Sequence, residues 1–239
     1  MYQGPNLPNL YQEIGSVYGW GGFMERYRYY AEEAVKLDGD SAGYYHDLAF
    51  SESWVGNFEK GIEYEEKAYA IDSTRYWVLL NLGVSHSFLD QYEKSLRYLI
   101  EYDKKFKVLD NPDPIGTFRV GHALWVNGLK DKAEIYFNTA LEFLNKAIEL
   151  GRIYVLDDYY NLAGIHSFLG EKEKAFEYLR LFKRELKGPF FYIEYLKKDP
   201  LFDNIRDEPE FQQIIRELEA RYQAKHERVR NWLEENDLL

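Results

Sequence analysis

Apolar positions along the chain recur every three to four residues in short stretches that end at a glycine or an aspartate. In one such stretch Leu79 and Leu82 precede Asp90, and a second apolar series restarts after it with Tyr92 and Leu96. This spacing is typical of an amphipathic helix, and the residue between the two series favours a tight turn. The pattern therefore predicts a unit of helix, turn and helix.

The unit recurs along the chain. Three consecutive copies share positions at a spacing of 34 residues. The matching positions are Tyr11, Ile14, Gly15, Gly22 and Ala34, then Tyr45, Leu48, Ala49, Gly56 and Ala68, then Leu79, Leu82, Gly83, Asp90 and Tyr102. Two further units follow at longer steps, 38 residues from Asp90 to Gly128 and 42 from Gly128 to Gly170. We expect five helix pairs between residues 9 and 186.

Local features explain the longer steps. Pro112 and Pro114 interrupt the chain before the fourth unit, because proline cannot continue a helix. From Ala133 to Gly151 apolar residues keep a helical spacing with no breaker, which predicts a long second helix in that unit.

These units resemble the tetratricopeptide repeat, whose pattern reads W-x2-L-G-x2-Y, then A-x3-F, then P. Leu79-x2-Leu82-Gly83-x2-His86 matches it in part, as does Tyr159-x2-Leu162-Ala163-x2-His166. Gly39, Ser73 and Lys107 stand where the closing proline would be. The resemblance covers residues 9 to 186 and implies an all-α superhelical solenoid of tetratricopeptide-like helix pairs.

Residues 187–239 differ from the repeats and are expected to form a C-terminal cap and terminal helix. Residues 199–211 resemble a segment that closes tetratricopeptide arrays in bacterial proteins. Asp207 is expected to cap the terminal helix, with Glu210 completing a capping box and Pro209 in the first turn. The apolar stripe from Phe211 to Tyr222 is expected to cover the fifth unit. Residues 1–239 would then form a single solenoid domain.

Composition narrows the partners. The formal net charge is -11, a field that repels phosphate backbones and anionic lipid, so we expect neither nucleic acid nor membrane as partner. A neutral or basic protein segment fits better than an acidic one. The chain has no cysteine, which suits a reducing compartment and slightly favours a cytoplasmic location.

Candidate chemistry is sparse. His86 and His166 occupy equivalent positions where the family has a packing aromatic residue, and His46 and His122 lack the pairing of a zinc site. We expect no metal and no cofactor. No Gly-x-Ser-x-Gly motif or cysteine nucleophile is present, so an enzyme is the least favoured reading.

Aromatic residues form a series two positions before the turns. Its members are Trp20, Trp54, Phe88 and Phe168, with Val126 at the fourth position. In a helix-pair solenoid the first helices line the concave side, so these rings could meet a partner. The other reading is that they fill gaps between successive helix pairs, as large apolar residues near a turn often do. Both readings stay open.

Polar residues on the first helices extend the candidate site. The resemblance implies that they face a ligand on the concave side, and Arg119 is the one basic residue at a place where carboxylate-clamping family members carry Lys or Arg. The predicted partner-binding residues are Gln12, Trp20, His46, Asp47, Trp54, Asn81, Phe88, Arg119, Trp125, Tyr160, Asn161 and Phe168.

The leading functional prediction is a non-catalytic scaffold for protein-protein interaction that captures a peptide or protein segment, within a larger bacterial regulatory or signalling protein. The alternative is a receptor for a small molecule or carbohydrate, because 22 Tyr, 15 Phe and 5 Trp offer many stacking faces.

Overall fold

The computed structural model describes residues 7–239 except 40, 114, 153–154 and 187–189, and these residues contain helices and no strand. The helices run in chain order as α1 (Leu7–Trp20), α2 (Met24–Asp38), α3 (Ser41–Ser53), α4 (Phe58–Ile71), α5 (Tyr76–Phe88), α6 (Tyr92–Phe106), α7 (Gly116–Val126), α8 (Lys130–Glu149), α9 (Val155–Phe168), α10 (Lys172–Glu185), α11 (Phe191–Lys198), the 3-10 helix η1 (Pro200–Phe202) and α12 (Pro209–Glu235).

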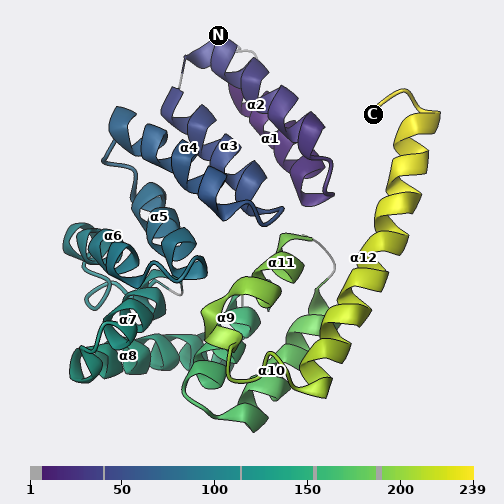
Figure 1. The fold of residues 1–239 in the computed structure, drawn as a ribbon. Helices are drawn as coiled ribbons and strands as arrows, with labels where there is room; N and C mark the ends of the chain where they lie inside the picture. Colours follow the sequence, from purple (N-terminus) through teal and green to yellow (C-terminus); the bar gives the residue numbers. More distant parts are fainter. Residues whose placement is uncertain (1–6, 40, 114, 153–154, 187–189) are drawn as a thin grey trace. The chain divides into compact units, whose positions relative to one another are not determined.

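Helices α1 to α10 form five consecutive hairpins, in which each odd-numbered helix packs against the next even-numbered one (Figure 1). The all-α array of tetratricopeptide-like helix pairs predicted from the sequence is confirmed. The long second helix of the fourth unit is also confirmed, since α8 has 20 residues.

The turns inside the five pairs share one backbone geometry. The backbone is left-handed two positions after each member of the aromatic series and after Val126. These residues are Gly22, Gly56, Asp90, Gly128 and Gly170, with φ between 57° and 86°. The amide of the following residue donates to a carbonyl five residues earlier, as from Phe23 to Tyr18 at 2.9 Å and from Glu171 to His166 at 2.8 Å. This bond closes the end of the first helix in the manner of a Schellman motif. The five units that repeat in the sequence therefore also share the same turn conformation.

Small residues let the two helices of a pair approach each other. A Cβ atom added at Gly83 of α5 would lie 2.4 Å from Cγ of Leu99 on α6. At the equivalent Gly15 of α1 it would lie 3.1 Å from Cβ of Tyr30 on α2. Leu99 is buried, so the absence of a side chain at Gly83 is part of how the third pair packs.

The helices divide into two compact units. The first unit comprises residues 1–72, 187–197 and 215–239, and the second comprises residues 73–186 and 198–214. The chain beyond residue 186 contributes segments to both units, which a count of repeats does not anticipate. The single solenoid domain expected for residues 1–239 stays a prediction.

The start of α12 differs from the predicted cap. The helix begins at Pro209, so Asp207 lies outside its first turn, whereas Pro209 is its first residue as expected. Glu210 accepts hydrogen bonds from Arg180 of α10 at 2.7 and 3.0 Å and does not complete a capping box. A guanidinium fork offers this carboxylate two charge-assisted bonds, which a single backbone amide cannot match.

Only the beginning of α12 belongs to the second unit. Phe211 packs against Phe202 of η1 there, with ring centroids 5.8 Å apart. From Ile215 onward α12 belongs to the first unit, where Tyr222 stacks on Phe190 at 5.4 Å. The apolar stripe expected to cover the fifth pair is therefore shared between the two units.

Within the described residues, none of the helices combines the length and the apolar character needed to cross a membrane.

Candidate partner-binding site

Two predicted polar residues of the first unit, Gln12 on α1 and Asp47 on α3, line one hollow. Gln12 is exposed on α1, and it lines the same small hollow, of about 10 Å³, as Tyr44 and Asp47 of α3. The Asp47 carboxylate accepts a hydrogen bond from the Tyr27 hydroxyl at 3.1 Å. Burial and the neighbouring Asp47 charge raise the pKa of Tyr27, so this hydroxyl stays protonated and keeps the carboxylate oriented. Two first helices thus present an amide and a carboxylate side by side.

His46, next to Asp47 on α3, is directed into the helix pair. Its Nδ1 atom lies 2.9 and 3.1 Å from the two carboxylate oxygens of Glu65 on α4, and its ring packs against Phe50 at a centroid distance of 4.4 Å. Glu65 itself is buried. The imidazole is half-buried and serves to connect the two helices of the second pair.

The two tryptophans of the aromatic series have different environments. Trp20 is 55% exposed at the end of α1. Trp54 is only 7% exposed, because its ring is stacked between Tyr27 of α2 and Phe191 of α11, at centroid distances of 5.7 and 4.8 Å. The structure thus places Trp54 in packing, the second of the two readings, and leaves the ring of Trp20 exposed.

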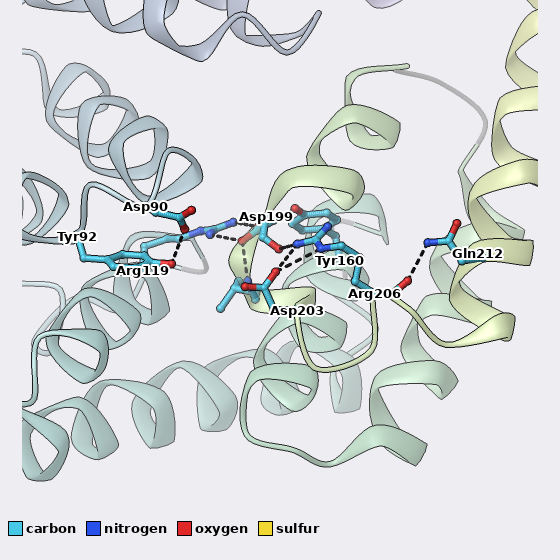
Figure 2. Close-up of polar contacts among 9 residues, drawn as sticks. Asp90, Tyr92, Arg119, Tyr160, Asp199, Asp203, Arg206 and Gln212 are labelled. Carbon is cyan, nitrogen blue, oxygen red and sulfur yellow. Dashed lines mark hydrogen bonds and ion pairs between the residues drawn. The ribbon is translucent and has the colours of Figure 1, made fainter.

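Arg119 and Tyr160 of the second unit both contact one buried carboxylate, that of Asp199 (Figure 2). Arg119 on α7 forms a bidentate pair with Asp199, with Nη1 donating to Oδ1 at 2.9 Å and Nη2 donating to Oδ2. Tyr160 on α9 donates to Oδ2 at 2.7 Å, and the Leu201 amide donates to Oδ1 at 3.1 Å. The two predicted ligand-facing residues instead hold the segment that precedes η1.

The electrostatics of this cluster are those of a stable ion pair. Burial acts to raise the pKa of Asp199, but the Arg119 guanidinium and the hydrogen bonds hold that pKa below its usual value. Burial likewise acts to lower the pKa of Arg119, and Asp199 outweighs it and raises that pKa. Both groups therefore stay charged, and the guanidinium that would clamp a ligand carboxylate is neutralised within the chain.

The remaining predicted residues of the second unit are either buried or half-buried. Phe88 is 7% exposed, with the Arg119 guanidinium 5.5 Å from its ring centroid, and Asn161 is 3% exposed. Asn81 of α5 is half-buried. Trp125 and Phe168 are also half-buried and form an edge-to-face pair at 6.0 Å. Their burial leaves limited surface for a partner.

The sequence pattern did not identify the residues that contact Arg119 and Trp54, which are Asp199 and Phe191. Asp199 and Phe191 lie outside the repeats, and no spacing rule connects them to Arg119 or Trp54. The Asp-Pro step at residue 199 was a signal, because the side chain of Asp199 also caps η1 through the Leu201 amide. Its contact with Arg119, 80 residues earlier, depends on tertiary structure.

The histidines at equivalent repeat positions pack as aromatic residues. His86 stacks on Tyr98 at 5.5 Å and His166 stacks on Tyr178 at 5.4 Å, and the two rings of each pair are nearly parallel. In the described part of the chain, no group of three or more His, Asp or Glu side chains is arranged to hold a metal ion.

Comparison with known proteins identifies the repeat. Residues 159–182, which span most of α9 and α10, match the family model described as tetratricopeptide repeat. A search of curated proteins found no match. Solved structures with a similar arrangement include MamA from AMB-1, at 18% identity over 74% of this chain and 97% of that chain with a TM-score of 0.47. YrrB, described as a TPR protein with an unusual peptide-binding site, is 19% identical over 85% of this chain and 89% of that chain, also with a TM-score of 0.47.

At these identities and TM-scores, the family assignment depends on the matched repeat and on the helix pairs of this chain. The fifth pair carries the family signature, and the four pairs before it share its turn geometry. The five helix pairs are therefore of tetratricopeptide-like architecture, and residues 159–182 carry the family's sequence signature.

Proposed function

We propose that the chain is a non-catalytic interaction module that captures a protein or peptide segment on the first helices of its first unit. The observation that carries the proposal is the convergence of Gln12 and Asp47, from two different helices, on one hollow. An amide and a carboxylate that line one hollow can pair with the amide groups of an extended backbone. Repeat arrays commonly use such surfaces for binding.

Charge supports a neutral or basic segment. Asp47 presents a carboxylate at the hollow, and the chain carries a net charge of -11. Arg119, the one cation at a clamp position, is buried and paired with Asp199. An acidic tail would meet repulsion without a compensating guanidinium.

Peptide selection tests this function. A random peptide library is panned on the protein, and the affinity of enriched peptides is measured by calorimetry for the wild type and for Gln12→Ala and Asp47→Asn. We expect neutral or basic peptides whose dissociation constants rise roughly tenfold in each variant, since each loses about one polar contact. Lys146→Ala, on the exposed side of α8, is the matched control and should bind as the wild type does.

Two results would contradict the proposal. Enrichment of acidic peptides would overturn the charge preference. Selected peptides that bind Gln12→Ala and Asp47→Asn as tightly as the wild type would place binding elsewhere.

The alternative, a receptor for a small molecule or carbohydrate, has less support. Two of the stacking rings that it needs, Trp54 and Phe88, are buried. A cavity of about 410 Å³ does exist in the first unit, but it lies at the start of α2, next to Phe23 and Arg230, and no predicted binding residue lines it.

A further inference from the structure

One face of α1 carries an exposed apolar stripe. Leu7, Leu10, Val17 and Trp20 are 51%, 40%, 67% and 55% exposed. Their spacing of three, seven and three residues places them along one side of the helix. Scattered apolar residues are ordinary on a surface, but an aligned set on a single helix marks an interaction face.

The equivalent positions of the next repeat show that this face can contact another helix. The positions 34 residues later are Tyr44 and Ser51 on α3 and Trp54 directly after it, and all three contact the preceding second helix α2. Tyr44 donates to Glu32 at 3.5 Å, Ser51 accepts from Arg28 at 3.1 Å, and Trp54 stacks on Tyr27 at 5.7 Å.

On α1 the same positions are Leu10, Val17 and Trp20, and in the described residues they remain exposed. The exposed positions of α1 therefore correspond to positions that join two helix pairs in the next repeat, and on α1 these positions carry apolar residues.

We propose that this face of α1 packs against the same face of a second copy of the chain, to form a two-fold symmetric dimer. Charge favours this occupant. Glu13 is the only charged residue among the 14 of α1, in a chain that is 30% charged. Two such faces can meet with little like-charge repulsion in spite of a net charge of -11 on each copy.

The exposed end of α12 fits this face less well, because its apolar Val229 and Trp232 alternate with Arg228, Arg230 and Glu234. A contact of α1 with α1 is also self-complementary and closes after two copies. The dimer assigns Trp20 to self-association and is independent of the proposed peptide site.

Sedimentation equilibrium of the 239-residue chain tests the dimer. We expect a concentration-dependent dimer, and Leu10→Glu and Val17→Glu should raise its dissociation constant about 100-fold or more, because each buries a carboxylate without a partner. Ile135→Glu on α8 is the matched control, since Ile135 is 55% exposed and lies far along the chain from this face. Circular dichroism checks that each variant keeps its helices.

Cysteine cross-linking locates the contact independently of stability. The chain has no cysteine, so Val17→Cys introduces a single thiol. Under mild oxidation Val17→Cys should form a disulfide-linked dimer far faster than Ile135→Cys. A chain that stays monomeric at about 100 μM, where even a weak dimer would be populated, overturns the proposal. A dimer that Trp232→Glu dissociates and Val17→Glu does not overturns it as well.

Discussion

At the scale of single residues, burial decides which polar groups remain available. The Asp199 carboxylate is fully buried and receives its bonds from Arg119, Tyr160 and Leu201. A buried ion pair that keeps this many hydrogen bonds is strongly disrupted when one partner is removed, by about 3–5 kcal/mol. These side chains therefore hold the cap segment in place, and their chemistry is used within the fold.

His122 of α7 shows the same effect on an ionisable group. Its ring packs edge-to-face on Phe168 at 4.9 Å, and its Nε2 atom is buried without a hydrogen-bond partner among the described residues. Burial, and then the Arg119 charge, lower the pKa of His122 from 6.5 to about 4, although Asp199 acts in the opposite direction. The imidazole is neutral in the folded chain at pH 7.

We predict that His122 makes the protein less stable in acid. Between pH 6.5 and about pH 4 the unfolded imidazole binds a proton and the folded one does not, so the free energy of unfolding falls as the pH falls. The loss should reach about 3 kcal/mol. In His122→Gln this contribution is absent, and urea unfolding at pH 7.0 and pH 4.5 should differ by less than in the wild type. Equal pH dependence in the two proteins would contradict the assignment.

At the scale of helices, each pair depends on close approach at one small residue. Gly83, Ala49 and Gly15 occupy the same repeat position, and all three are buried. The contact is tightest at Gly83, where the branched end of Leu99 fills the space a side chain would take. Tolerance to substitution should therefore differ between equivalent positions.

We predict that Gly83→Ala destabilises the protein by about 1–3 kcal/mol, the usual cost of overpacking a well-packed core, despite the higher helix propensity of alanine. Thermal unfolding measures the loss. The Gly83→Ala, Leu99→Ala double variant should be less destabilised than the sum of the single variants, because the shorter side chain removes the clash. Ala49→Gly, the reverse change at the equivalent position, should cost about 1 kcal/mol. Additive losses would argue against a direct contact.

At the scale of the whole molecule, the residues after the repeats serve two units. Residues 198–214 complete the second unit, and α11 with most of α12 completes the first. In the first unit, the ring of His226 stacks on Phe23 at 4.5 Å, and its Nδ1 atom lies 2.8 Å from the Gly21 carbonyl oxygen. The Tyr18 hydroxyl donates to the Leu238 carbonyl at 2.8 Å. The chain end thus covers the turn between α1 and α2.

We predict that removing residues 215–239 loosens the first helix pair selectively. Amide hydrogen exchange in α1 and α2 should accelerate about tenfold or more, because Phe23 and the Gly21 carbonyl lose the residues that cover them. Exchange in α7 and α8, which lie in the second unit, should change much less. Trp232→Ala serves as control, since this exposed ring should contribute little. Uniform acceleration across all helices would mean that the two units unfold together.

Local patterns in the sequence determined much of this protein. The 34-residue period, the turn residues and the prolines before the fourth unit predicted five helix pairs and a long α8, because amphipathic spacing and turn chemistry act over a few residues. The composition also argued against an acidic partner, because the net charge can be counted from the sequence without coordinates.

Tertiary structure decided which candidate residues remain on the surface. Trp20 and Trp54 occupy the same repeat position, yet Phe191 covers Trp54, and Trp20 stays exposed. The sequence predicted that Arg119 faces a ligand, whereas in the structure it pairs with Asp199, which lies 80 residues later in the chain. Such contacts join residues that no periodic rule connects, and burial depends on what packs against a side chain. The sequence therefore predicted the helices, and only their packing with the segment after the repeats separated exposed candidate residues from buried ones.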